Sequence, residues 1–174
     1  CHKDSTASNP ESKLYAFDAG ARAIMDHYKR VGIEAERVEK GVDYGIYHSV
    51  YKIQGEPLVS IIIPNKDHHT DLDLCLRAIE TRATYRNVEF IIVENNSTEK
   101  ETFEYYERIQ TELPKAKVVY WKDKGFNYPS INNMGVDESK GKYLLFLNND
   151  TEIVNPDCIS EMLSQCQRPE VGAV

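Results

Sequence analysis

Polar side chains follow three apolar runs of the sequence directly, and their types could bind a phosphate-bearing ligand. The apolar runs are 59–63, 88–93 and 143–147, and the polar clusters after them are 65–67, 94–97 and 148–150. Continuous apolar runs predict strands that are buried on both faces, as in a parallel sheet. Because parallel strands end at one edge of a sheet, where ligands bind in open α/β folds, we expect one site built from these three clusters.

The third cluster, Asn148-Asn149-Asp150, offers oxygen ligands that suit Mg²⁺ or Mn²⁺ holding a phosphate. An ordinary Asn/Asp turn after a strand explains this stretch equally well when it is taken alone. However, residues 64–69 after the first run read Pro-Asn-Lys-Asp-His-His, so a glycine-rich dinucleotide loop is absent there, and a P-loop is absent as well. A divalent cation at Asp150 is therefore the simplest remaining device for holding a phosphate.

Other candidate ligands give weaker signals. His68 and His69 are adjacent, so they point in different directions, and a solvated loop is the favoured interpretation over metal ligation. Single lysines are usually solvated, although Lys66 and Lys124 could contact a diphosphate. Lys124 is favoured because Gly125 follows it in a loop expected at the same edge.

Composition narrows the classes of partner and the compartment. The 174 residues carry a net charge of −7 without a basic stripe, which argues against nucleic acid as a partner. None of the four cysteines forms a C-x-x-C pair, and Cys75 and Cys166 fall on apolar helix faces, so we expect a reducing compartment rather than a zinc site. A membrane-spanning stretch and a signal peptide are not evident, and we expect a soluble, cytoplasmic protein.

The chain divides into a tail, a front section and a main domain. Residues 1–12 are small and polar and predict a disordered tail. Residues 13–55 predict an accessory helix, from Leu14 to just before Gly32, followed by one or two short strands or extended segments. Residues 56–174 hold the main domain. The final residues 170–174 resemble the start of another strand, so we expect a domain cut from something longer.

Helical patterns alternate with the strands of the main domain. The predicted apolar helix faces are Leu72/Cys75/Leu76/Ile79, Phe103/Tyr106/Ile109 and Ile159/Met162/Leu163/Cys166. Pro64 is predicted to end the first strand, and Gly141 to end a helix. The predicted helix caps are Thr70, Thr98 with Glu101, and Asn155. Pro129 and Pro156 are predicted as first helical residues. Strands alternating with helices predict βαβ crossovers and an α/β fold with a parallel sheet.

Residues 57–150 resemble the nucleotide-sugar-binding half of family 2 glycosyltransferases, which have the GT-A fold. PLVSIIIPNKD is similar to that family's V-S-I-I-I-P-x-x-N/D opening, and VEFIIVENNST to its E-I-I-V-V-D-D-G-S-T segment. NYPSINNMGVDESKGKYLLFLNND resembles its A-x-x-N-x-G…A-x-G-x-Y-L-L-F-L-D-x-D segment. The resemblance implies a three-layer, Rossmann-like, mostly parallel sheet. The front section is similar to what precedes this domain in polysaccharide and O-antigen-type members.

The resemblance also implies residue roles. Asp150 matches the last acid of D-x-D and would bind Mg²⁺ or Mn²⁺ on the diphosphate, whereas Asn148 replaces the first acid and would hydrogen-bond ribose, sugar or a metal-bound water. Glu94 and Asn95 match the D-D pair that contacts the base and ribose, and the Asn95 amide oxygen could accept the N3–H of a pyrimidine. The predicted nucleotide-sugar-binding residues are Pro64, Asn65, Asp67, Glu94, Asn95, Asn96, Lys124, Asn127, Asn133, Asn148 and Asn149.

The implied reaction is inverting transfer of a sugar from a nucleoside diphosphate sugar to a saccharide or lipid-linked saccharide acceptor, in polysaccharide synthesis. The family's general base is an Asp or Glu well downstream of D-x-D, so we expect it after Val174 and assign no catalytic residue here. Parts outside this sequence could associate with the inner face of the membrane. A non-catalytic nucleotide-sugar-binding or scaffolding module with a degenerate site is the alternative, since Asn148, Glu94 and Asn95 depart from the usual acids. A nucleotidyltransferase is disfavoured because the first loop lacks glycines.

Overall fold

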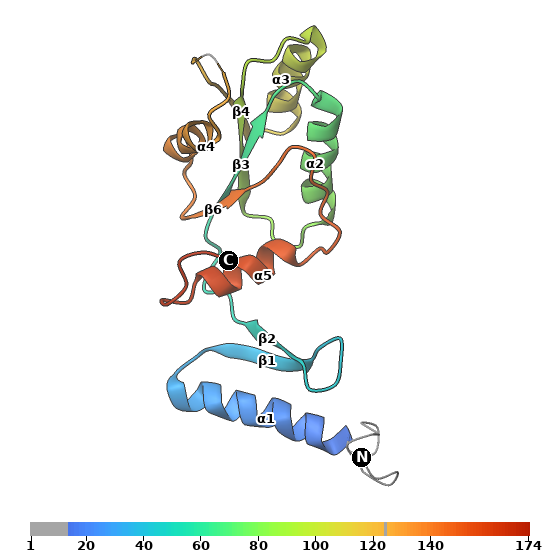
Figure 1. The fold of residues 1–174 in the computed structure, drawn as a ribbon, viewed down its shortest axis with the longest axis vertical. Coiled ribbons are helices and arrows are strands. Elements are labelled where there is room, and N and C mark those ends of the chain that lie inside the picture. Colours follow the sequence, from blue (N-terminus) through green and yellow to red (C-terminus); the bar gives the residue numbers. More distant parts are fainter. Residues whose placement is uncertain (1–13, 124) are drawn as a thin grey trace.

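A parallel sheet with strand order β5-β4-β3-β6 forms the centre of the main domain (Figure 1). The computed structural model describes residues 14–123 and 125–174. The strands are β3 (Val59–Asn65), β4 (Val88–Glu94), β5 (Ala116–Tyr120) and β6 (Tyr143–Phe146). They alternate with helices along the chain, which confirms the predicted α/β fold and parallel crossovers.

Helices cover both faces of this sheet, so the domain has three layers. The helices are α2 (His69–Arg82), α3 (Lys100–Glu112), α4 (Tyr128–Asp137) and α5 (Cys158–Cys166). The larger apolar core joins one sheet face to α2, α3 and α5, while a second cluster joins the other face to α4 (Figure 1). The predicted inward face of α2 is confirmed, because Leu72, Cys75, Leu76 and Ile79 are all buried. On α3, Tyr106 and Ile109 of the predicted apolar face are buried together with Tyr105, while Phe103 at the edge of that face is 38% exposed.

The first strand continues through Pro64, which was predicted to end it. Pro64 pairs with Val93 and Asn65 with Glu94 in the register of β3 and β4. In this strand the Ile62 carbonyl faces β6 and accepts from the Leu147 N–H, and Pro64 has the same orientation two residues later. Because β6 has already ended there, the missing N–H of proline leaves no partner unpaired, and the strand reaches Asn65.

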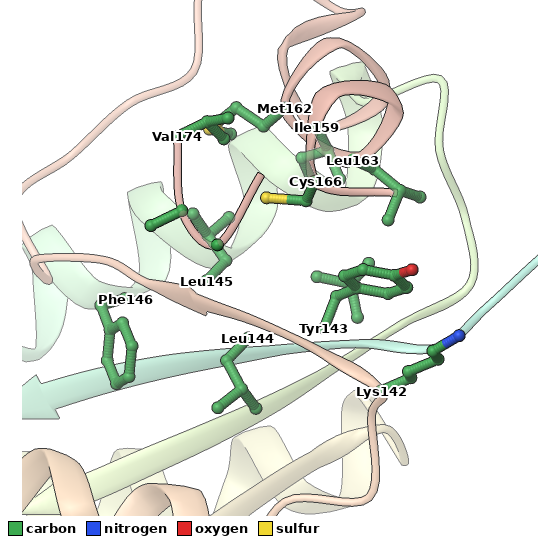
Figure 2. Close-up of a pocket in the computed structure, with 13 residues that line it drawn as sticks. Lys142, Tyr143, Leu144, Leu145, Phe146, Ile159, Met162, Leu163, Cys166 and Val174 are labelled. Atoms are coloured by element: carbon green, nitrogen blue, oxygen red, sulfur yellow. The ribbon is translucent and has the colours of Figure 1, made fainter. Parts of the chain in front are cut away.

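Strand β6 lies at the edge of the sheet, and the prediction that it is buried on both faces was wrong. Leu144 is 39% exposed and Phe146 is 49% exposed. Figure 2 shows these two side chains on the sheet face opposite to Tyr143 and Leu145, which point toward α5. A cavity of about 570 Å³ lies between β6 and α5, and its apolar lining distinguishes it from the polar ends of the strands.

The helix starts differ from the predicted caps. Thr70 and Thr98 do not supply a side-chain cap for α2 or α3, which begin after His68 and Glu99. Helix α5 begins at Cys158, and Asn155 instead accepts from the Asp157 N–H in the preceding turn (3.0 Å). These threonines fail as caps because each lies one or two residues away from the position where the helix begins.

Two small residues allow close packing of α4 and of the segment before β6. A Cβ on Gly135 would lie 2.4 Å from Ile62 Cγ2, so glycine lets α4 approach the sheet. Helix α4 ends at Asp137, not at Gly141 as predicted. Gly141 instead passes β3, donating to Ser60 Oγ (2.8 Å), where a Cβ would be 2.6 Å from the Ser60 backbone nitrogen.

The front section forms a helix packed on an antiparallel hairpin. Its elements are α1 (Leu14–Val31), β1 (Ala35–Lys40) and β2 (Tyr47–Tyr51), as predicted, and Gly32 follows α1 with a positive φ of 76°. Figure 1 shows this section beside α5. Gln54 and Gln167 exchange two backbone-to-side-chain hydrogen bonds (2.8 and 2.9 Å), and Arg168 stacks on the Tyr51 ring at 4.6 Å. Across residues 14–123 and 125–174, we find no helix with the length and hydropathy needed to span a membrane.

Candidate functional site

The polar ends of β3, β4 and β6 meet at one edge of the sheet, as the sequence predicted. The Asn95 N–H donates to the Asn65 carbonyl (2.8 Å), joining the ends of β3 and β4. The Asn149 side chain donates to Asn65 Oδ1 (2.7 Å), which brings the loop after β6 to the same point. Asn65, Glu94 and Asn95 are each at most 5% exposed. Buried polar groups need partners, so this edge is a built arrangement rather than a set of solvated turns.

Glu94 is held inside the protein by donors from its own loop and from α3. Its carboxylate accepts from the Ser97 N–H, from the Ser97 hydroxyl and from the Tyr106 hydroxyl (2.7 Å). Tyr106 is fully buried, and this burial raises the pKa of its hydroxyl well above the usual range, with the Glu94 carboxylate adding to the effect. Tyr106 therefore stays protonated and donates its single hydroxyl proton to Glu94.

Asp67 stabilises the loop between β4 and α3. Its carboxylate accepts from the N–H groups of Thr98 (2.7 Å) and Glu99 (2.9 Å), and its own N–H donates to Ser97 Oγ (2.7 Å). The backbone N–H of Glu99 is the main cause that holds the pKa of the Asp67 carboxyl below its usual value. Asp67 adopts a φ of 53°, in the left-handed region that Asp tolerates better than most residues. The predicted binding residue Asp67 thus ties two of the three loops together.

The loop after β6 places Asn148 and Asp150 at the surface and Asn149 between them in a partly buried position. Cys75 of α2 contacts this loop, with its Sγ 3.8 Å from the Asn148 carbonyl oxygen. Burial, reinforced by the negative charge of Asp150, raises the pKa of the Cys75 thiol to about 11. The Cys75–Asn148 contact thus places the loop after β6 against the buried face of α2.

Asp150, the predicted metal ligand, is an exposed carboxylate at this edge. The described part of the chain holds no group of three or more His, Cys, Asp or Glu side chains placed to bind a metal ion. Mg²⁺ and Mn²⁺ are commonly held by one or two carboxylates with phosphate oxygens completing the set, so one exposed carboxylate beside amide oxygens fits a cation that arrives with a diphosphate. His68 is exposed near Asp71 (3.7 Å), and the His69 ring lies 6.0 Å from that of Tyr105.

The remaining predicted residues lie around the bonded cluster. Pro64 is half-buried beside it in β3. Asn96 has a φ of 56° and donates to Asn95 Oδ1 (3.2 Å) and to the Asp123 carbonyl (3.1 Å), linking the loops after β4 and β5. Asn127 accepts from the Ser130 N–H (3.2 Å) as the cap of α4, and Asn133 is exposed on that helix. The predicted diphosphate contact Lys124 lies outside the described residues.

Sequence reasoning missed Tyr106 as part of the site, whereas Ser97 belonged to the predicted polar cluster 94–97 without being named as a binding residue. Tyr106 was assigned to the apolar face of α3 by its spacing, and it does pack in the core. The available signal was its hydroxyl, since a buried tyrosine usually needs a hydrogen-bond partner, and the nearest polar groups would be those at the strand ends.

An open parallel sheet with polar groups gathered at its carboxyl edge is typical of domains that bind nucleotides. The sequence model described as Glycosyl transferase family 2 matches residues 60–174. The chain belongs to this family. It is 41% identical over 160 residues to the O-antigen biosynthesis protein RfbC of Myxococcus xanthus, covering 91% of this chain and 12% of RfbC. It is 37% identical over 171 residues to protein y4gI of Sinorhizobium fredii, covering 98% of this chain and 19% of that protein.

Solved glycosyltransferases share the fold, which is therefore of the GT-A type. A mannosyltransferase of Pyrobaculum calidifontis, PcManGT, solved with GDP-Man and Mn²⁺, aligns with a TM-score of 0.60 at 18% identity over 68% of this chain and 34% of that one. TarS of S. aureus, residues 1–349 solved with UDP-GlcNAc, aligns with a TM-score of 0.53 at 18% identity over 62% of this chain and 30% of that one. The chain thus spans 12% to 19% of its curated relatives and about a third of these solved chains.

Proposed function

We propose that this chain is the donor-binding part of a glycosyltransferase that transfers a sugar from a nucleoside diphosphate sugar to a saccharide acceptor during polysaccharide synthesis. One observation carries the proposal: Asn65, Glu94 and Asn149, from three separate strand ends, meet in one hydrogen-bonded cluster beside the exposed Asp150. The relationship to RfbC, whose name describes O-antigen biosynthesis, supports the class of product.

In this proposal, different residues at the sheet edge bind different parts of the nucleotide sugar. Asp150 would hold Mg²⁺ or Mn²⁺, which supplies charge compensation for the departing diphosphate when bound. Asn148 would hydrogen-bond ribose or sugar hydroxyls. The Asn95 amide oxygen would accept the N3–H of a pyrimidine, so UDP is the favoured nucleotide, although the solved relatives were captured with both GDP-Man and UDP-GlcNAc.

The reaction that such a site serves is an inverting displacement. The acceptor hydroxyl oxygen forms a bond to the anomeric carbon of the sugar, and the bond from that carbon to the diphosphate oxygen breaks. A general base takes the hydroxyl proton, and the configuration at the anomeric carbon inverts. The acceptor would be a free or lipid-linked saccharide.

A panel of nucleoside diphosphates tests the proposal by thermal unfolding of the 174-residue chain. UDP with Mn²⁺ should raise the melting temperature more than GDP, ADP or Mn²⁺ alone, because a ligand that binds only the folded state stabilises it. Asp150→Ala should abolish the shift, whereas Asp26→Ala on the distant helix α1 should retain it. Failure of every nucleotide to shift the wild-type transition would contradict donor binding.

The burial of Glu94 favours a second candidate, a non-catalytic module that binds the nucleotide sugar. Its carboxylate already accepts three hydrogen bonds within the protein, so it has little capacity left to contact a base or ribose. Measurement of sugar transfer by the complete protein separates the two candidates. Tight donor binding without transfer would favour the module, and transfer would favour the enzyme.

A further inference from the structure

A continuous chain of side-chain hydrogen bonds crosses the sheet edge from α3 to the loop after β6. Tyr106 donates to Glu94 (2.7 Å) and accepts from Asn65 Nδ2 (2.7 Å). Asn65 Oδ1 in turn accepts from Asn149 Nδ2 (2.7 Å). Tyr106 and Asn65 are almost wholly buried, so water does not compete for these bonds.

The direction of the bonds in this chain follows from two groups that only accept, the Glu94 carboxylate and the Asp67 backbone carbonyl. An ionised Glu94 can only accept, so it takes the one proton of the Tyr106 hydroxyl. The Tyr106 oxygen must then accept from Asn65, whose Nδ2 also donates to the Asp67 carbonyl (2.9 Å). Asn65 is thereby forced to turn its amide oxygen toward Asn149.

Asn149 consequently has to donate, and this anchors the middle of the Asn148–Asp150 loop. The exposure pattern agrees, because Asn149 is partly buried while Asn148 and Asp150 on either side are exposed. A side chain tied inward at the central position directs its two neighbours outward. The same bond limits what Asn149 can offer a ligand, since one of its two amide N–H groups is already used.

We propose that Tyr106 and Asn149 are positioning residues, which hold the Asn148–Asp150 loop against the ends of β3 and β4 so that Asn148 and Asp150 face the nucleotide sugar. This inference rests on the proposed donor-binding function and assigns to Asn149 an anchoring role in place of direct contact. Tyr106 acts through Asn65 and Glu94, at a distance from the ligand.

Tyr106→Phe tests this proposal, with Tyr105→Phe as the matched control. Tyr105 is also buried on α3, but its hydroxyl donates to Asp73 (3.1 Å), away from the chain of bonds. In ¹⁵N–¹H NMR spectra of the ligand-free protein, Tyr106→Phe should shift the side-chain amide signals of Asn65 and Asn149 and the backbone signals of residues 148–150. Tyr105→Phe should leave them in place. Unchanged signals in Tyr106→Phe, or equal changes in both variants, would overturn the proposal.

Nucleotide affinity supplies the second readout. We expect Tyr106→Phe and Asn149→Asp, which cannot donate to Asn65, to raise the Kd for UDP with Mn²⁺ by about 2- to 10-fold, the range for one buried hydrogen bond. Tyr105→Phe should keep the wild-type Kd. Equal weakening in both tyrosine variants would contradict positioning by Tyr106. If the wild-type chain binds no nucleoside diphosphate, the proposed function fails, and the NMR comparison still decides whether the chain of bonds orders the loop.

Discussion

Replacement of Asp67 tests whether its carboxylate joins the loop after β3 to the start of α3. Asp67→Asn keeps an oxygen acceptor and tolerates the left-handed φ of 53°, so it removes mainly the negative charge that accepts two backbone N–H groups. Charge-assisted bonds of this kind are worth more than neutral ones, and we expect a loss of about 1 kcal/mol in the free energy of unfolding. Asp67→Ala also loses the acceptor and the tolerance for this φ, so the loss should reach about 2 to 3 kcal/mol.

The loss of stability caused by Asp67→Asn should depend on pH. Because the pKa of Asp67 is lowered in the folded state, its contribution is fully present above the unfolded pKa, near 4, and is lost as the pH falls through the folded value. The stability difference between wild type and Asp67→Asn should therefore be largest at pH 7 and should shrink below about pH 4.

Urea unfolding followed by circular dichroism at pH 7 and at pH 3 measures both effects. Asp26→Asn is the control, since Asp26 pairs with Lys29 at 3.9 Å on the exposed face of α1, and such surface pairs contribute little. A loss for Asp67→Asn no larger than that of the control, or a loss that does not change with pH, would refute the assigned role of Asp67.

Two further predictions concern the packing that supports the site. Gly135→Ala should destabilise the protein by about 1 to 3 kcal/mol in thermal unfolding, because the added Cβ would lie 2.4 Å from Ile62 Cγ2. This clash should outweigh the better helix propensity of alanine. A stabilised variant would show that α4 is free to move away from the sheet. The Cys75 thiol, with its pKa raised to about 11, should react with a thiol reagent at pH 8 much more slowly than the partly exposed Cys158 and Cys166, as read by mass spectrometry. Equal labelling of all three would contradict the burial of Cys75.

The sequence predicted the parallel sheet and its polar edge because both follow from local patterns. Apolar runs of strand length alternate with helical spacing, and each run leads directly into polar residues. Parallel pairing in register then brings Asn65 beside Glu94, as observed. The convergence of the strand ends could therefore be predicted from the topology alone, without the details of side-chain packing.

Features that depend on distant residues could not be predicted from local pattern. The run at residues 143–147 has the composition of a buried strand, but its exposure depends on which neighbours flank it, and β6 has a strand partner on one side in the described sheet. The backbone at the start of α3 bonds to Asp67, 31 and 32 residues earlier, where a local threonine cap had been expected. Tyr106 looked like any core residue until the structure placed its hydroxyl beside Glu94.

The central claim is that a nucleoside diphosphate and a divalent cation bind at the sheet edge through Asp150. Paramagnetic broadening by Mn²⁺ in the presence of UDP tests this most directly, because it locates the cation in ¹⁵N–¹H NMR spectra of the chain. The account predicts that signals of residues 148–150 broaden first, and that Asp150→Ala removes the effect. Broadening centred on another part of the chain, or persisting unchanged in Asp150→Ala, would contradict it.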